Sequence, residues 1–181
     1  MPRFLFICLG FFCAASVISA PVTGKPCSFN LVDVDGRTLT ASDGVVTLLV
    51  LARRANAEKV RLVADRVPAR CLGVPASRMV TVVLFQPTQN RAVRLMLTSV
   101  MRHRLDQEAK QLKQKYVAKG LDRDARQDVY AIADFDDAAA TQLGLSPDSL
   151  AFKVLVISGN GTVLGDWDDI PSAEELSKIL P

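Results

Sequence analysis

The sequence has few of the side chains on which most enzyme active sites depend. Its 181 residues include four cysteines and one histidine, His103. A single histidine excludes a multi-histidine metal site within the chain, and any Ser-His-Asp or Cys-His catalytic group would have to use His103. Because His103 lies between Arg102 and Arg104 in a basic segment, we interpret it as a surface residue without a catalytic role.

An excess of charge of one sign is also lacking. The formal net charge is only +3, which is too small to indicate nucleic-acid binding. Hydrophobic residues make up 49% of the chain and charged residues 23%, a balance that excludes wholesale disorder and a polytopic membrane protein. No internal repeat or low-complexity linker is visible, so we expect one domain with a core large enough to fold without a metal.

The first twenty residues have the pattern of a secretory signal. Arg3 supplies a positive charge, residues 4–17 are almost wholly apolar, and the small residues Ser19 and Ala20 follow. An uncleaved membrane anchor is the alternative, although a run of about 17 residues is at the short limit for a span. We predict a signal peptide over residues 1–20 and a single domain over residues 21–181, located in the periplasm or secreted.

Export changes what the cysteines can do. Cys8 and Cys13 would leave with the signal, and Cys27 and Cys71 would remain. An exported chain can keep such a pair as a disulfide, and two unpaired thiols are the alternative. The spacing between positions 27 and 71 fits no metal-ligand motif, so we expect no metal site.

Hydrophobic periodicity predicts strands that alternate with helices. We expect a hairpin over residues 29–40, strands over 45–51, 79–85, 129–133, 152–157 and 162–167, and helices over 55–70, 91–119, 138–143 and 173–180. Alternation of this kind predicts a parallel sheet, to which the last two strands add an antiparallel edge. This layout is that of an α/β fold of the thioredoxin-like type, a three-layer sandwich whose central mixed sheet here has an N-terminal hairpin extension.

The position at which such a fold carries its redox chemistry is empty of sulfur. In thioredoxin-like enzymes a cysteine follows the first core strand, where the N-terminus of the next helix stabilises its thiolate. Here residues 51–58 read L-A-R-R-A-N-A-E, without cysteine, serine or threonine. Those enzymes also have a cis-proline before the strand that enters the last hairpin, and here that position falls near Phe152, with Ala151 before it. Without a thiol there is no nucleophile for a disulfide or a peroxide.

At this point the chain resembles the YtfJ-type periplasmic proteins, a branch of the thioredoxin-like superfamily. The resemblance covers residues 45–181 and is carried by A-R-R-A-N-A-E-K at 52–59 and by A-F-K-V-L-V-I-S-G-N-G-T-V-L-G-D-W-D-D-I-P-S-A-E-E-L at 151–176. That group is similar in lacking the paired active-site cysteines. The resemblance implies an exported, redox-inactive protein of this fold, and we expect no cofactor.

The vacant site keeps groups that could bind a ligand. Arg53 and Arg54 precede a helix whose first amides are unpaired, and helix N-termini together with guanidinium groups attract carboxylate and phosphate. We hypothesise that Arg53, Arg54, Ala55 and Asn56 bind a small anion or a peptide carboxylate of an envelope partner. The alternative is that both arginines are solvated, or that one pairs with a nearby aspartate.

The competing functional hypothesis is an enzyme. A thiol-disulfide oxidoreductase or peroxidase would use Cys71, with Cys27 resolving the intermediate. Cys71 falls near the end of the predicted helix over residues 55–70, where the helix dipole disfavours a thiolate. We therefore favour the non-catalytic binding module.

Two charged regions remain. The predicted helix over residues 91–119 holds eight lysines or arginines and two acidic residues, which indicates either contact with an anionic membrane or acidic partner, or simply a solvated face. The acidic clusters 134–137 and 166–169 do not have EF-hand spacing, and we attribute the first to capping of the next helix by Asp136 or Asp137.

One buried face of the 91–119 helix is predicted to comprise Val93, Leu97, Val100, Met101, Leu105, Ala109, Leu112 and Tyr116.

Overall fold

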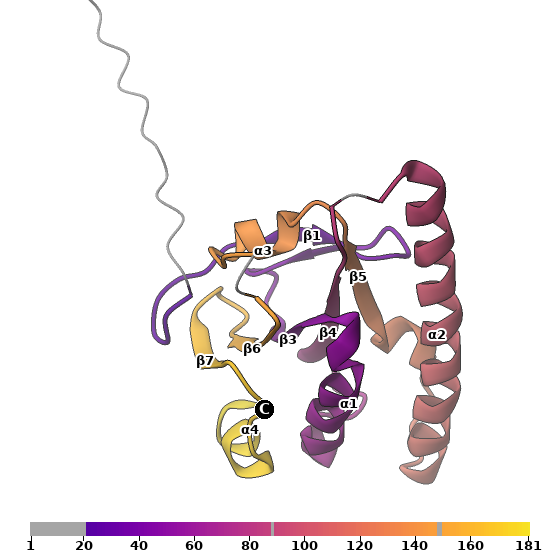
Figure 1. The fold of residues 1–181 in the computed structure, drawn as a ribbon. Coiled ribbons are helices and arrows are strands. Elements are labelled where there is room, and N and C mark those ends of the chain that lie inside the picture. The colour runs from indigo at the N-terminus through magenta and orange to yellow at the C-terminus, as the bar shows by residue number, and fades with distance from the viewer. Residues whose placement is uncertain (1–20, 88, 148–149) are drawn as a thin grey trace, which may run out of the picture.

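A computed structural model describes residues 21–87, 89–147 and 150–181, so the predicted signal over 1–20 lies outside the described residues. Figure 1 shows the arrangement of the elements. In chain order they are β1 (Asn30–Val32), β2 (Thr38–Thr40), β3 (Val46–Arg53), η1 (Arg54–Asn56), α1 (Ala57–Arg66), η2 (Ala69–Cys71), β4 (Ser77–Leu84), α2 (Arg91–Ala118), η3 (Ala125–Asp128), β5 (Tyr130–Asp134), α3 (Ala138–Gln142), β6 (Phe152–Ile157), β7 (Val163–Trp167) and α4 (Ala173–Ile179), where η marks a short 3-10 turn.

The central sheet has the predicted mixed topology. Its strand order is β5-β4-β3-β6-β7. β3 pairs in parallel with β4, and β4 with β5, whereas β6 runs antiparallel to β3 and β7 antiparallel to β6. β3 occupies the middle of the sheet, so its continuous apolar run is buried on both faces, with Leu49, Val50 and Leu51 fully inaccessible. The fold is therefore α/β and thioredoxin-like.

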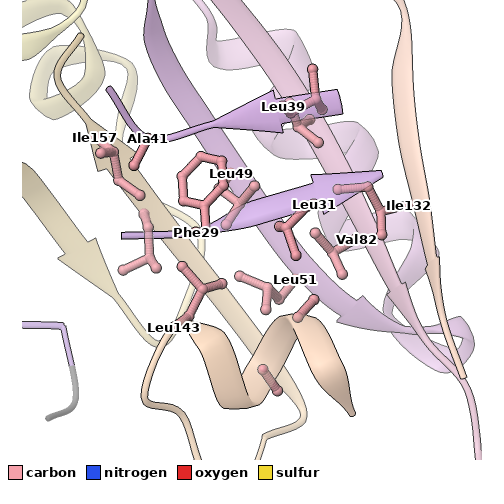
Figure 2. Packing of buried hydrophobic residues seen from close by; sticks show 14 of the residues in the cluster. Phe29, Leu31, Leu39, Ala41, Leu49, Leu51, Val82, Ile132, Leu143 and Ile157 are labelled. Atoms are coloured by element: carbon pink, nitrogen blue, oxygen red, sulfur yellow. The ribbon is translucent and has the colours of Figure 1, made fainter. Parts of the chain in front are cut away.

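Each face of the sheet is covered by a different set of elements. α1 and α4 lie side by side on one face, where Val63 and Leu176 pack against Val50 and Val154. The β1–β2 hairpin and α3 cover the other face, and Figure 2 shows Leu31 and Leu39 of that hairpin in one cluster with sheet residues such as Leu49. The hairpin forms a separate two-stranded sheet, so it extends the fold as a covering layer rather than as further strands of the central sheet.

A buried ion pair fixes the hairpin to the domain. The Asp33 side chain is fully buried and accepts hydrogen bonds from the Arg37 amide at 2.7 Å and from Arg37 Nε at 2.6 Å. The same guanidinium donates to the carbonyls of Gln127, at 3.0 Å, and Val129, at 2.6 Å. It also lies over the Tyr130 ring, 4.1 Å from the ring centroid. One arginine thus joins the hairpin turn to the chain that leads into β5.

α2 stands at one edge of the molecule (Figure 1). It is anchored by Met101 and Leu105, which pack with Ala131 of β5, and further along by the buried Ala109 and Tyr116. The prediction that Val100 belongs to the buried face is wrong, because its side chain is 47% exposed. The sheet edge contacts only a narrow stripe of the helix that includes Met101, and the Val100 side chain lies outside this stripe. No helix among the described residues combines the length and apolar character needed to cross a bilayer.

Candidate functional site

The two segments that the sequence marks as a vacant redox site lie next to each other. β3 ends at Arg53, and β6 begins at Phe152, which pairs with Ala52. The chain after β3 turns through η1 into α1 beside the segment that enters β6. A pocket of about 330 Å³ lies at this junction. Its lining residues are Asn56, Lys59, Leu145, Ser146, Leu150, Ala151, Phe152, Lys153 and Asp168.

Of the four predicted ligand-binding residues, only Asn56 lines this pocket. Arg53 Nε donates to the Leu150 carbonyl at 3.1 Å, and its Nη2 donates to the Pro147 carbonyl at 2.9 Å. Its guanidinium therefore holds the segment before β6 instead of facing a ligand, which corrects the expected role. Arg54 and Ala55 are exposed outside the pocket.

Asn56 also serves the main chain. Its Nδ2 donates to the Ala151 carbonyl at 2.9 Å, and the Arg53 amide donates to the same carbonyl at 3.3 Å. Ala151 directly precedes Phe152, near which the sequence analysis places the cis-proline position of thioredoxin-like enzymes. Its carbonyl is thus engaged within the chain. No peptide bond among the described residues is cis.

Two lysines that the sequence analysis did not single out give the pocket its charge. Lys153 is only 11% exposed and forms ion pairs with Asp166 and, at 2.9 Å, with Asp168. Lys59 pairs with Asp169 at 2.9 Å, and its Nζ lies 5.3 Å from the centroid of the Phe152 ring. The sequence feature that could have indicated this role is Lys153 itself, the one lysine in the otherwise apolar strand over 152–157, together with the acidic run at 166–169.

The ionisation of these groups follows from their neighbours. Burial lowers the pKa of Lys153, but hydrogen bonds and charge attraction from Asp166 and Asp168 together outweigh burial, and the net pKa lies above its usual value. The pKa of Asp169 is lowered, mainly by its hydrogen bond with Lys59. At neutral pH the pocket therefore presents ammonium groups that are matched by carboxylates. The partner Asp168 is 89% exposed, so its contact is open to exchange with solvent ions.

The structure does not bring either described cysteine to this pocket. Cys71 ends η2, beyond the C-terminus of α1, and packs with the α1–α4 face of the sheet. Cys27 packs on the hairpin face. Both are free thiols, and the sheet stands between them, so the predicted Cys27–Cys71 disulfide is not formed.

Neither thiol is in an activating environment. Burial raises the pKa of Cys27 and is also the main reason why the pKa of Cys71 is raised, although Arg70 and Lys119 oppose it there. The Cys71 Sγ donates to the Pro181 carbonyl at 3.1 Å. A thiol with a raised pKa holds little thiolate at neutral pH.

The first acidic cluster serves a structural contact, whereas the second supplies the carboxylates that pair with the lysines of the pocket. Asp134, which is buried, accepts hydrogen bonds from the amides of Ala138, Ala139 and Ala140 at 2.9, 3.0 and 3.3 Å. Capping is therefore the role of the first cluster, but Asp134 provides it rather than Asp136 or Asp137, because only a carboxylate at the end of β5 lies beneath the first turn of α3. Within the described part of the chain, no group of three or more His, Cys, Asp or Glu side chains is placed to hold a metal ion.

Comparison with known proteins supports the fold. No family model matches the sequence, and no curated protein matches it. A domain from Bacteroides thetaiotaomicron, named as the C-terminal domain of a thiol-disulfide oxidoreductase, matches with a TM-score of 0.50 and 14% identity over 87% of this chain and 92% of that chain. The exposed lipoprotein thioredoxin of Streptococcus pneumoniae matches with a TM-score of 0.49 and 14% identity over 84% of this chain and 96% of that chain. At such identities the likeness is one of fold alone.

Proposed function

We propose that this protein is a non-catalytic binding module built on a thioredoxin-like fold. The observation that carries the proposal is the position of the cysteines. The N-terminal end of α1 has none, and Cys27 and Cys71 lie elsewhere as free thiols whose pKa is raised by burial. A thiol-disulfide reaction needs a thiolate that is exposed and stabilised. Both thiols are only partly exposed, and the pKa of each is raised rather than lowered, so binding is the activity that the described geometry supports best.

The ligand we propose is a carboxylate, carried by a small acid or by a peptide of an envelope partner. Lys153 supplies the recognition, because its ammonium lines the pocket and one of its two carboxylate partners, Asp168, is almost fully exposed. An incoming carboxylate can take the place of Asp168 on the Lys153 Nζ without leaving a buried charge unpaired. Phe152 and Leu145 add an apolar wall for the rest of the ligand.

The proposed setting is the periplasm or the exterior of the cell, and the proposed affiliation is with the YtfJ-type proteins. Both rest on the sequence: the signal pattern over residues 1–20, and the two segments at 52–59 and 151–176 on which the resemblance depends. The proposal for the pocket does not depend on either.

The absence of thiol chemistry is open to direct assay. We expect the full chain to reduce insulin and to consume peroxide no faster than its Cys71→Ala variant, because the raised pKa of Cys71 leaves its thiol protonated at pH 7. A rate well above buffer that disappears with Cys71→Ala would overturn the non-catalytic proposal and favour an oxidoreductase.

Carboxylate binding is measurable by NMR titration with acetate and with a short peptide rich in glutamate. We expect shifts at the amides of Asn56 and Lys153, and we expect Lys153→Met to weaken binding at least about tenfold, the usual value of a hydrogen bond to a charged group. Lys178→Met is the matched control, because Lys178 pairs with Glu174 on the exposed side of α4, outside the pocket.

A second variant keeps the test decisive if Lys153→Met folds poorly. Asp168→Asn removes the exposed competitor and leaves Asp166 in place, so it should strengthen binding while the fold is kept. Unchanged affinity in Asp168→Asn, or no amide shifts in the wild-type chain, would rule out this pocket as a carboxylate site.

A further inference from the structure

The exposed apolar side chains of this domain are concentrated on one helix. The described residues include six large hydrophobic side chains that are exposed, and four of these belong to α2. They are Leu95 at 64%, Met96 at 58%, Val100 at 47% and Val117 at 69% exposure. Leu95, Met96 and Val100 lie within two turns of the helix, and clustered exposed apolar residues of this kind commonly mark a docking surface.

These residues are exposed on α2 and lie outside the stripe that anchors this helix to the sheet. Met96 and Val100 are four residues apart and share one side of the helix, with Leu95 beside Met96, and Lys110, Lys113 and Val117 follow three- and four-residue spacing further along. We call this set the outer face of α2. It is separate from the anchoring stripe of Met101, Leu105, Ala109 and Tyr116, although Lys110 and Lys113 also border a shallow groove beside η3. α2 itself lies at the edge of the molecule (Figure 1). From Leu95 to Val117 the outer face is roughly 33 Å long, at about 1.5 Å for each residue.

The charge of α2 is positive and largely unneutralised on this side. Residues 91–119 contain eight lysines and arginines and only two acidic residues, Asp106 and Glu108. Asp106 is already paired with Arg126 at 2.8 Å. Within the described chain, the ion pairs include neither Lys110 nor Lys113. The outer face therefore offers apolar side chains in its first half and free ammonium groups in its second half.

We infer that the outer face of α2 docks onto an anionic lipid surface. Leu95, Met96 and Val100 would enter the boundary between headgroups and acyl chains, while Lys110 and Lys113 reach lipid phosphates. Because lysine side chains are long and flexible, their ammonium groups can reach the phosphates while the apolar side chains of the same helix, lying flat on the surface, enter the membrane. A second copy of this chain fits less well, because an antiparallel partner helix would bring lysines of one copy against the apolar half of the other, and residues 95–100 contain no carboxylate to match them.

Brominated lipids test where this helix sits. The full chain carrying Met96→Trp is mixed with vesicles of brominated phosphatidylglycerol, or of brominated phosphatidylcholine, and tryptophan quenching is recorded. The full chain carrying Lys178→Trp is the control, because Lys178 is exposed on α4, and α4 and α2 lie on opposite sides of the molecule (Figure 1). The native Trp167 contributes the same background to both variants, and any lipid binding by residues 1–20 is common to both as well.

We expect strong quenching and a blue shift for Met96→Trp on the anionic vesicles, and little change for Lys178→Trp. Adding Lys110→Gln and Lys113→Gln should lower the partition coefficient by roughly fivefold for each lysine removed, and about 0.5 M salt should release the helix. Equal quenching of the two tryptophan variants, or none for Met96→Trp on the anionic vesicles, would overturn the inference. If soluble polyglutamate instead shifts the emission of Met96→Trp and the vesicles do not, the face is assigned to an acidic protein and lipid docking is rejected.

Discussion

Replacing Arg37 with methionine should lower the free energy of unfolding by roughly 3 kcal/mol, the usual effect of removing one partner from a buried ion pair. The Asp33 side chain is fully buried, and Arg37 is its charged partner at 2.6 Å. The variant would keep most of the aliphatic bulk of the side chain but leave the carboxylate in place without its counter-charge. The carbonyls of Gln127 and Val129 would lose a donor at the same time.

Urea denaturation followed by circular dichroism measures this change. Arg61→Met is the matched control, because Arg61 pairs with Glu58 on the exposed side of α1 and both side chains are about two-thirds exposed. Surface pairs of that kind contribute about 0–1 kcal/mol, so the control should unfold close to the wild type. If Arg37→Met and Arg61→Met unfold at the same urea concentration, Arg37 does not stabilise the junction between the hairpin and β5.

The second large effect is expected at Asp134. Asp134→Ala removes the acceptor for the amides of Ala138, Ala139 and Ala140, of which the last two residues are buried. Buried donors left without a partner cost about 1–3 kcal/mol, so we expect a loss of roughly 2–3 kcal/mol in unfolding free energy. Faster hydrogen exchange at these three amides would accompany the loss.

The chemistry of the cap predicts a graded series. Asp134→Asn keeps one oxygen acceptor and should lose less stability than Asp134→Ala. Asp136→Ala is the control in the same cluster: Asp136 is exposed and pairs with Arg94 at 2.6 Å, and its removal should cost about 1 kcal/mol or less. Equal losses in Asp134→Ala and Asp136→Ala would show that α3 does not depend on the buried cap.

The strands and helices could be predicted because they depend on local patterns. The short, continuous apolar run at residues 45–51 is typical of a strand that is buried on both faces, and in the structure it forms most of β3. The capping box of Ser172 and Glu175 defines the start of α4 through reciprocal hydrogen bonds. The parallel and antiparallel pairings then follow from the alternation of elements.

The sequence predicted where the site lies in the fold, but not which side chains line it. The vacant thiol position was recognisable because it directly follows β3, whereas the partners of Arg53 are carbonyls more than ninety residues away in the chain. Nothing in the local pattern tells an arginine that binds a ligand from one that binds the main chain. The Lys153–Asp168 pair depends in the same way on how two strands of a hairpin meet. For Val100, helical periodicity defined a face wider than the sheet edge that it meets.

The position of β3 between β4 and β6 constrains how the domain can be assembled. One neighbour of β3 follows after a single helix, but the other is contributed by residues 152–157, near the end of the chain. A chain that emerges from its N-terminus therefore carries the hydrophobic edge of β3 open until residues 152–157 have been synthesised. Completion of the sheet is a late, long-range event, and the unfinished chain needs protection from aggregation until then.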